Sequence, residues 1–317
     1  MSKTSDLPHV SILVVAYNSQ AIIGDCLASI PAGCSRFTYE VLLIDNGDGA
    51  SADLVSAQFP EVMIVPSQGN VGFAAGNNLL AAQASGEHLL LLNPDVVLKP
   101  EAIDLLLDAT KAYPAASAWG GVTLDRNDRP DLGNNVHIPS LREMASRTLG
   151  RSIAGRGRHD CIEQDVEVDA LSGSFVMFAR SAWDEVGGLD ERYFLYCEEV
   201  DLFYRLAQRG HRFWRIAASS ANHDIGHGEA TSPTRELYLN AGIIQFTRLH
   251  WSKSGALLAF LLIWISSVQR FILAKMFGWA FPSLAKTGKK QRLVALRPHF
   301  WSHGYHPQFG LLAKLRQ

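Results

Sequence analysis

Carboxylate side chains occur where they could bind a cation or move a proton. Asp95 lies in the segment LLLLNPDV, shortly after the apolar run and two residues after Asn93. A hard divalent cation prefers oxygen ligands of this kind and usually shares them with phosphate oxygens. The same three residues could instead cap a following helix, with Pro94 forcing the turn. The residue types therefore leave both a cation site and a helix cap open at this point.

A second group of acids, Glu198, Glu199 and Asp201, crowds the start of a predicted helix. The helix dipole favours acids there, so capping is one interpretation. Adjacent carboxylates also repel each other, which raises the pKa of at least one of them toward the range of a general base. A proton-transfer role is therefore the other interpretation.

Two histidines, His223 and His227, lie in the polar, Gly-flanked segment ASSANHDIGHG. Such a loop offers little apolar packing, so metal ligation or contact with a diphosphate stands beside a structural role. The glycine-spaced run at 69–78 lacks GxGxxG spacing and follows the third predicted strand rather than the first. This disfavours a nicotinamide oxidoreductase and leaves close backbone approach to a sugar or nucleotide, or simple tight packing.

The elements that must position these residues alternate between short apolar strands and helices. We predict strands at 10–16, 40–45, 62–66 and 88–92, and helices at 19–30, 51–58, 73–84 and 100–112. This alternation predicts a parallel α/β sheet. Ligands bind at the carboxyl ends of the strands in such sheets, which selects Tyr17-Asn18, Asp45-Asn46 and Asn93-Pro94-Asp95.

The second half of the chain is less regular. Residues 125–165 are rich in Arg, Asp, Gly and Asn without periodicity, which predicts a long loop. A strand at 172–179, helices at 180–186 and 198–208, a short strand at 213–216 and a helical stretch from 231 to about 281 follow.

Six motifs occur in a fixed order: VSILVVAYN, LLIDN, GNVGFAAGNN, LLNPD, SGSFVMFARSAWDEVGGLDERYFLYCEEVDLFYRL and NHDIGHG. Over about residues 9–250 this series resembles the family 2 glycosyltransferases of the GT-A fold, and most of all their bacterial rhamnosyl- and galactofuranosyltransferase branch. The resemblance implies an α/β fold with a mostly parallel sheet and flanking helices. It also implies an inverting, Mg²⁺- or Mn²⁺-dependent transfer of a sugar from a nucleotide-diphosphate donor.

The resemblance also implies roles for individual residues. The donor would contact Ala16, Tyr17, Asn18, Asp45, Asn77 and Asn93, with Asp45 at the base. Asp95 is the implied metal ligand, and His223 falls near the metal and the diphosphate. Glu199 stands at the position of the catalytic base, whereas Glu198 and Asp201 would bind or orient the acceptor or hold the helix. Trp183 lies in the acceptor-side helix, where a structural role is equally open.

Two positions depart from the family pattern. Glu199 stands where an Asp is usual, which moves the carboxylate by one methylene. Asp48-Gly49 stands where Ser-Asp is frequent, so the contacts of that pair are not carried over to this chain.

Charge is unevenly distributed along the 317 residues. The formal net charge is −2, yet residues 237–317 hold eleven Lys and Arg, no acid and four of the seven Trp, so residues 1–236 carry −13. We therefore expect a catalytic domain at 1–236 and a basic, apolar helical extension at 237–317. Within the first we expect a nucleotide-sugar half (9–124), a mobile loop (125–165) and an acceptor half (166–236).

Cysteine spacing and the amino terminus indicate the compartment. The four cysteines lack CxxC spacing and no His lies at zinc-finger distance, which disfavours a disulfide framework or structural zinc. The first residues lack the apolar core and cleavage site of a signal peptide. We expect a reduced, cytoplasmic protein that does not bind nucleic acid.

The basic extension contains sixteen uncharged residues between Lys253 and Arg270. A span needs about 20 residues, so we expect an interfacial helix on an anionic membrane surface. The alternative is a helix packed on the catalytic domain or in a homo-oligomer interface.

These features predict a peripheral enzyme on the cytoplasmic face of the bacterial inner membrane. It would act on a lipid-linked or polysaccharide acceptor in cell-envelope glycan synthesis. The first donor expected is dTDP-rhamnose, and the second is the UDP-sugar of galactofuranose. A catalytically silent membrane-bound scaffold is the alternative of another class.

Overall fold

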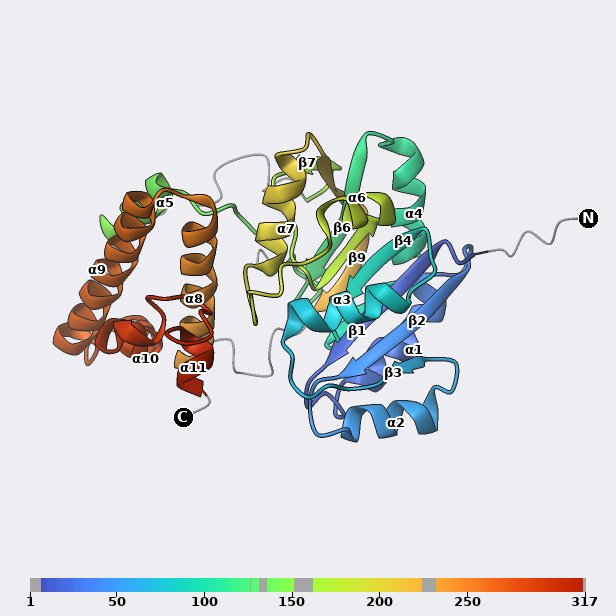
Figure 1. Cartoon of the computed structure of the whole chain (residues 1–317). Helices are drawn as coiled ribbons and strands as arrows, with labels where there is room; N and C mark the ends of the chain where they lie inside the picture. The colour runs from blue at the N-terminus through green and yellow to red at the C-terminus, as the bar shows by residue number, and fades with distance from the viewer. Residues whose placement is uncertain (1–6, 126, 131–135, 151–161, 224–231, 316–317) are drawn as a thin grey trace, which may run out of the picture. The chain divides into compact units, whose positions relative to one another are not determined.

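The computed structural model describes residues 7–125, 127–130, 136–150, 162–223 and 232–315 (Figure 1). These residues form two compact units. The first takes its described residues from 7–137, 162–190 and 199–223, and the second from 138–150, 191–198 and 232–315.

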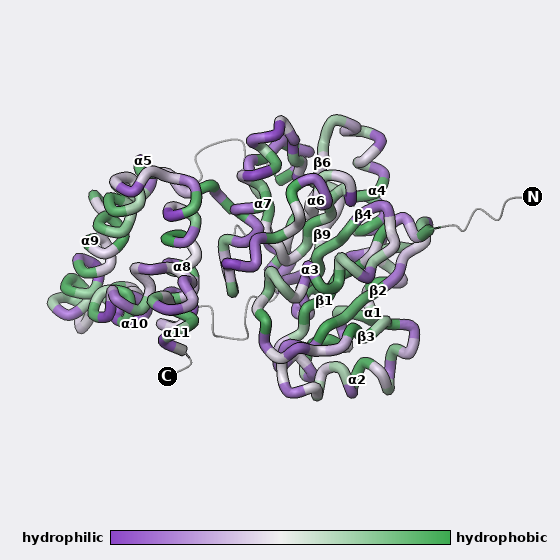
Figure 2. Tube along the Cα trace, in the orientation of Figure 1, coloured by the Kyte–Doolittle hydropathy of each residue, from purple (hydrophilic) through white to green (hydrophobic). Residues whose placement is uncertain are grey.

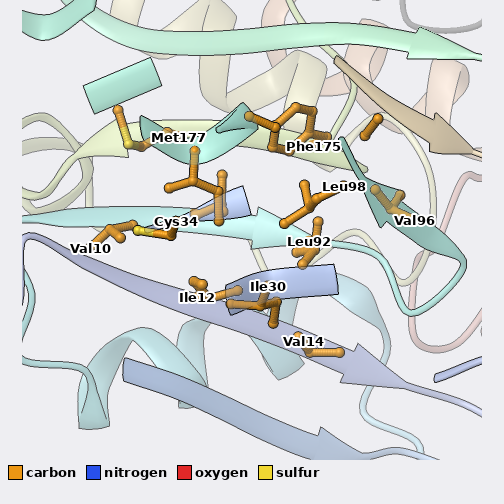
Figure 3. Close-up of a cluster of buried hydrophobic side chains, with 14 of the residues drawn as sticks. Val10, Ile12, Val14, Ile30, Cys34, Leu92, Val96, Leu98, Phe175 and Met177 are labelled. Carbon is orange, nitrogen blue, oxygen red and sulfur yellow. The ribbon is translucent and has the colours of Figure 1, made fainter. Parts of the chain in front are cut away.

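The centre of the first unit is a sheet whose first strands are buried on both faces. β1 (Val10–Ala16), β2 (Tyr39–Asp45) and β4 (His88–Leu92) are apolar almost throughout. Ile12 and Val14 of β1 enter one hydrophobic core (Figure 3), whereas Leu13 and Val15 enter a second. Successive strand residues point to opposite faces, so a strand with both faces covered needs an uninterrupted apolar run.

The sheet order among the described residues is β3-β2-β1-β4-β8-β6-β9-β5, with β7 paired to β9. The remaining strands are β3 (Met63–Val65), β5 (Val96–Leu98), β6 (Ala116–Leu124), β7 (Val166–Val168), β8 (Phe175–Ala179) and β9 (Arg212–His223). The pairs β1–β2, β1–β4 and β2–β3 are parallel, which confirms the parallel sheet predicted for the first part of the chain. The second part is mixed, because β8 pairs antiparallel with both β4 and β6.

The helices of the first unit follow the predicted alternation. They are α1 (Ile23–Gly33), α2 (Ala50–Gln58), α3 (Phe73–Gln83), α4 (Ala102–Ala112), α6 (Arg180–Val186) and α7 (Glu198–Ala207), whose first residue belongs to the second unit. Residues of α1 and α4 contribute to one core and those of α3, α6 and α7 to the other. The two faces of the sheet are therefore covered by different sets of helices.

Hydrogen bonds to Glu40 connect the amino ends of β1 and β2 with the segment that precedes β4. The Ser11 hydroxyl (2.6 Å), the Ser85 amide (2.6 Å) and the Ser85 hydroxyl (2.8 Å) all donate to Oε1 of Glu40. Partial burial raises the pKa of this carboxyl, but the hydrogen bonds from Ser11, Ser85 and Gly86 outweigh it, and the pKa lies below its ordinary value.

The structure corrects the sequence predictions for β9, His223 and residues 125–165. The strand predicted at 213–216 is the twelve-residue β9, because pairing with β5, β6 and β7 extends it. His223 is therefore the last residue of a strand rather than part of a loop. The loop predicted at 125–165 contains α5 (Leu141–Thr148), where Oγ of Ser140 accepts a hydrogen bond from the Glu143 amide at 3.2 Å.

The second unit is helical. It contains α5, α8 (Pro233–His250), α9 (Lys253–Phe277), α10 (Pro282–Leu296) and α11 (Leu311–Leu315), with a 3-10 turn at Pro298–Phe300. The helical stretch predicted from 231 to 281 is interrupted after His250, where Ser252 caps α9 by accepting a hydrogen bond from the Gly255 amide at 3.2 Å.

Of the described helices, α9 alone is long and apolar enough to cross a membrane by length and composition. One side of it packs within the unit. Ala259, Ser266 and Ser267 are buried, and the Trp264 indole donates to the carbonyl oxygen of Ala295 on α10 at 3.0 Å. β1, β4 and much of α9 are coloured hydrophobic in Figure 2.

Candidate active site

The carboxyl ends of β1 and β2 are joined into one polar surface. The Asn46 amide donates to the carbonyl oxygen of Ala16 at 2.8 Å. A β-carbon at Gly47 would lie 2.9 Å from Oδ1 of Asn18 and 3.0 Å from Oδ1 of Asp45, so only glycine fits between these side chains. Tyr17 is 58% exposed beside them. The structure thus brings together the donor-binding residues predicted at these two strand ends.

Asp45 is buried and serves as the cap of α2. Its Oδ1 accepts a hydrogen bond from the Gly47 amide (2.7 Å), and its Oδ2 accepts from the amides of Ser51 (3.0 Å) and Ala52 (3.1 Å). Gly49, the residue before α2, has φ +93° and supplies no side-chain cap. Asp48-Gly49, a departure from the family pattern, is therefore the turn that lets Asp45 cap this helix.

The glycine-rich entry into α3 packs closely on the sheet. Nδ2 of Asn46 donates to the carbonyl oxygen of Gly72 at 2.9 Å. A β-carbon at Gly76 would lie 3.1 Å from a methyl group of Val15, which identifies tight packing as the reason for this glycine. Asn77 is buried and donates to the carbonyl oxygen of Phe73 in its own helix at 3.0 Å, so its side chain supports α3.

Asp95 and His223 lie side by side because of strand register. β5 pairs antiparallel with β9, and Val96 lies opposite His223. Oδ1 of Asp95 is 3.4 Å from Nε2 of His223, and their side chains are 21% and 13% exposed. A strand, not a helix, follows Asp95, so the helix-cap interpretation of this residue is wrong.

The two side chains fit a shared divalent cation. A carboxylate oxygen and an imidazole nitrogen at this separation can both bind one ion. Among the described residues no group of three or more His, Cys, Asp or Glu could hold a metal, so phosphate oxygens and water would complete the coordination. His227 lies outside the described residues.

A buried thiol lies next to this pair. Sγ of Cys26 donates to the carbonyl oxygen of Asn93 at 3.5 Å. Burial, and after it the negative charge of Asp95, raises the pKa of Cys26 far above its ordinary value. The thiol is therefore neutral and is part of the packing beneath Asp95.

Glu199 is brought to the same end of the sheet by the turn before β8. The Asn93 amide donates to the carbonyl oxygen of Ser174 at 2.9 Å. A β-carbon at the neighbouring Gly173 would lie 3.3 Å from the ring of Phe73 and 3.7 Å from Cβ of Glu199. The turn therefore contacts the strand end at Asn93 on one side and Glu199 on the other.

The other two acids of the cluster are buried. Oδ2 of Asp201 lies 2.6 Å from Nε of Arg205, whose other nitrogens donate to the carbonyl oxygens of Val186 (2.9 Å) and Gly188 (2.8 Å). Asp201 thus holds α7 to the end of α6, the structural alternative among its predicted roles. Glu198 is 3% exposed.

Residues 11–184 match the family described as Glycosyl transferase family 2. The chain is a member of this glycosyltransferase family. It is 32% identical over 251 residues to the N-acetylglucosaminyl-diphospho-decaprenol L-rhamnosyltransferase of Mycobacterium tuberculosis, covering 71% of this chain and 79% of that protein. It is 27% identical over 231 residues to the rhamnosyltransferase WbbL of Escherichia coli, covering 69% and 84%.

Solved structures show the fold of this glycosyltransferase to be GT-A. The mannosyltransferase PcManGT of Pyrobaculum calidifontis, in complex with GDP-Man and Mn²⁺, has a TM-score of 0.57 at 14% identity and covers 92% of this chain and 86% of its own. GalNAc-T7 with UDP, GalNAc and Mn²⁺ has a TM-score of 0.57 at 11% identity, covering 95% and 58%. Both neighbours were solved with a divalent cation.

Two further residues of the glycosyltransferase take structural roles. Trp183 is 4% exposed and meets the ring of Phe178 edge-on at 5.7 Å, so it belongs to the core. Sequence reasoning missed Asn78, which donates to the carbonyl oxygen of Leu189 (2.8 Å) and accepts from its amide (3.0 Å). The consecutive asparagines at 77 and 78 were the available signal, because a side-chain amide can both donate to and accept from a backbone peptide group.

Proposed function

We propose that this glycosyltransferase moves L-rhamnose from dTDP-rhamnose to a sugar carried on a lipid-linked diphosphate, in an inverting and divalent-cation-dependent reaction of cell-envelope glycan synthesis. The observation that carries the proposal is the Asp95–His223 pair, at 3.4 Å, at the same end of the sheet as Glu199. The two rhamnosyltransferase relatives support the sugar, and the decaprenyl-diphosphate acceptor named for one of them supports the acceptor class.

Asp95 and His223 would hold the cation, together with oxygens of the donor diphosphate. A cation bound there would neutralise negative charge on the departing nucleoside diphosphate. The exposed residues Tyr17 and Asn18, which follow the buried Ala16 at the end of β1, would hold the nucleotide together with the backbone around Asp45. Since ligands bind at the carboxyl ends of strands in α/β sheets, donor and cation share one edge.

Glu199 would act on the acceptor. Its carboxylate accepts the proton of the acceptor hydroxyl, and the hydroxyl oxygen attacks the anomeric carbon from the face opposite the diphosphate. The bond from the anomeric carbon to the diphosphate oxygen breaks, and its electron pair leaves with the nucleoside diphosphate. One displacement inverts the configuration and needs no covalent enzyme intermediate.

The test is transfer from a panel of dTDP-, UDP- and GDP-sugars to a polyprenyl-diphosphate N-acetylglucosamine acceptor with Mn²⁺ or Mg²⁺. Glu199→Gln is expected to lower kcat by about 10²- to 10⁴-fold, the usual contribution of a general base. Its donor-induced thermal shift should stay near that of the wild type, because donor binding does not need the base.

Glu87→Gln is the matched control, since Glu87 is exposed at the amino end of β4, the opposite end of the sheet. Near-normal turnover in Glu199→Gln would contradict the assignment of the base. Absence of transfer with every donor in the panel would favour the catalytically silent scaffold instead.

We propose further that α9 attaches the enzyme to the anionic cytoplasmic face of the membrane. The side of α9 away from the unit exposes a row of large apolar side chains. These are Leu257, Leu258, Leu261, Ile265, Ile272, Leu273, Met276 and Phe277, followed by Trp279 and Phe281. They recur at spacings of three and four residues, so most of them share one stripe.

The contacts of α9 support a helix lying in the membrane surface rather than across it. Oγ1 of Thr148 on α5 donates to the carbonyl oxygen of Leu262 at 3.1 Å, and Gly288 on α10 leaves room for Ala274. Arg270 is partly buried among these helices, and this burial lowers its pKa. A helix with one side bound to protein and the other apolar, flanked by Lys and Trp, suits an interfacial position.

Vesicle flotation tests the attachment, with equimolar phosphatidylglycerol and phosphatidylcholine compared with phosphatidylcholine alone. The double variant L261E/I265E should lose at least tenfold in partitioning, because each buried apolar side chain contributes about 1.5–3 kcal/mol. Met63→Glu is the control, since Met63 is an exposed apolar residue of β3. Equal flotation of all three proteins would refute the attachment.

A further inference from the structure

The turn before α7 has an unusual backbone. Tyr196 and Cys197 are consecutive non-glycine residues with φ +68° and +71°. Residues with a β-carbon rarely adopt this left-handed conformation, and two in succession persist only where surrounding contacts fix them. The turn leads directly into α7, whose second residue is Glu199. The turn therefore immediately precedes the helix that carries Glu199.

A buried tyrosine from the carboxyl-terminal segment holds this turn. Tyr305 is 2% exposed, and its hydroxyl donates to the carbonyl oxygen of Leu195 and lies 2.9 Å from the carbonyl oxygen of Tyr238 on α8. The ring of Phe194 lies 6.0 Å from that of Tyr238 and 6.5 Å from that of Tyr305. Contacts from residues far apart in sequence thus converge on residues 194 and 195.

α8 contacts both the turn at 195–197 and Tyr305. A β-carbon on Gly242 would overlap the carbonyl oxygen of Tyr196 and approach Sγ of Cys197 to 3.1 Å, so a glycine is required where the turn crosses the helix. One helical turn later, Oε1 of Gln245 accepts a hydrogen bond from the Tyr305 amide at 3.2 Å. The turn and Tyr305 are therefore anchored to the same helix.

The hydroxyl of Tyr305 is a permanent donor. Burial, followed by the charges of Glu198 and Cys197, raises its pKa well above the ordinary value. The group stays protonated throughout the pH range in which the enzyme would work. It can therefore donate to a backbone carbonyl under all assay conditions.

We propose that Tyr305 is a positioning residue for Glu199: it fixes the turn at 195–197 and, through the continuous chain, the start of the helix that carries the base. This inference rests on the proposed function of Glu199. It gives the carboxyl-terminal segment a part in turnover, in addition to any attachment to a membrane. A small displacement of a catalytic group lowers turnover strongly, whereas donor binding at the strand ends does not depend on it.

The test is the variant Tyr305→Phe in the full-length chain, which keeps the ring and removes only the hydroxyl. We expect kcat to fall by about 10- to 100-fold, with the KM for the sugar nucleotide and the donor-induced thermal shift within about twofold of the wild type. Trp301→Phe is the control, because it removes a hydrogen bond from another fully buried ring, donated to the carbonyl oxygen of Val294 at 3.1 Å.

A double variant separates positioning from general stability. If Tyr305 acts through Glu199, adding Tyr305→Phe to Glu199→Gln should lower the residual rate by less than twofold. A purely structural role would lower the rate by the same factor in both backgrounds. Gly242→Ala should displace the same turn, because its β-carbon would overlap the carbonyl oxygen of Tyr196, and it should cause the same loss in kcat. If Tyr305→Phe does not fold, Gly242→Ala tests the positioning role in its place.

The inference is overturned if Tyr305→Phe keeps kcat within twofold of the wild type, or if Trp301→Phe loses as much. It is also overturned if the two losses in the double variant multiply. A failure of the proposed function is a different result, namely a wild type without transfer or an active Glu199→Gln. With transfer and a Glu199-dependent rate established, an unaffected Tyr305→Phe refutes the positioning role alone.

Discussion

Replacing Asp45 by Asn tests whether this residue caps α2. The carboxylate accepts hydrogen bonds from three backbone amides, one on Oδ1 and two on Oδ2, and it is 2% exposed. An asparagine keeps one acceptor oxygen and turns an NH₂ group toward the remaining amide donors. The variant can therefore satisfy either Gly47 or the first turn of α2, but not both.

The expected loss follows from these contacts. One charge-assisted hydrogen bond to a buried group contributes about 1.5–3 kcal/mol. Removing the negative charge from the start of a helix costs about 0.3–1 kcal/mol more. Asp45→Asn should therefore lower the unfolding free energy of the first unit by about 2–4 kcal/mol.

Hydrogen exchange measured by mass spectrometry on peptides from β2 and α2 reads this loss within the unit itself. A loss of 2–4 kcal/mol corresponds to exchange faster by about 30-fold or more, since each 1.4 kcal/mol is a factor of ten. The matched control is Asp53→Asn, because Asp53 is an exposed acid in the first turn of the same helix. If both variants exchange equally fast, the capping role assigned to Asp45 is refuted.

Three further predictions concern other acids. Because the folded-state pKa of Glu40 is lowered, the stability that its carboxylate contributes is present above about pH 4.3 and is lost as pH falls through the folded-state pKa. The free energy of unfolding, measured with urea from pH 6 to 3, should therefore depend less on pH in Glu40→Gln than in the wild type. An equal pH dependence in the two proteins would contradict this. Asp201→Asn breaks the ion pair with Arg205 and should lower the free energy of unfolding by about 3 kcal/mol or more, which is measured as a lower melting temperature. An unchanged melting temperature would show that this ion pair does not stabilise the fold. Asp95→Ala should abolish the thermal stabilisation that Mn²⁺ adds in the presence of the nucleotide, whereas a full Mn²⁺ effect would place the cation elsewhere.

The first half of the sheet could be predicted from the sequence for a clear reason. β1, β2 and β4 are apolar almost throughout and are bounded by polar residues, and such runs need cover on both faces. The strand ends lie where each apolar run changes to polar residues. The residues at the carboxyl edge could therefore be selected before their contacts were known.

β6, and β9 beyond the predicted residues 213–216, could not be predicted because tertiary contacts, not propensity, make these segments strands. In β6 the pair Gly120-Gly121 has low strand propensity, but a β-carbon at Gly121 would approach the carbonyl oxygen of Ser219 to 2.8 Å, so only glycine allows β9 this close. The middle of β9, AASSA, has no apolar pattern, and its neighbours in the sheet impose its conformation.

In the candidate site, too, the residue types could be predicted from the sequence, whereas the contacts between them could not. Asp95 and His223 each carry a local signal, but their adjacency depends on β5, whose three residues give no periodicity of their own. The capping role of Asp45 depends on the left-handed Gly49, which lets the chain turn back over the carboxylate. α5 had a sequence signal, since Ser140 and Glu143 have capping-box spacing before a helix.

Sugar transfer itself tests the proposed roles of Asp95 and Glu199 most directly. The wild type, Asp95→Ala and Glu199→Gln would be assayed with dTDP-rhamnose, Mn²⁺ and a polyprenyl-diphosphate N-acetylglucosamine acceptor, with the anomeric configuration of the product read by NMR. The proposed mechanism predicts an inverted rhamnoside from the wild type, with turnover at least a hundredfold lower in both variants. Retention of configuration, or variants as active as the wild type, would contradict it.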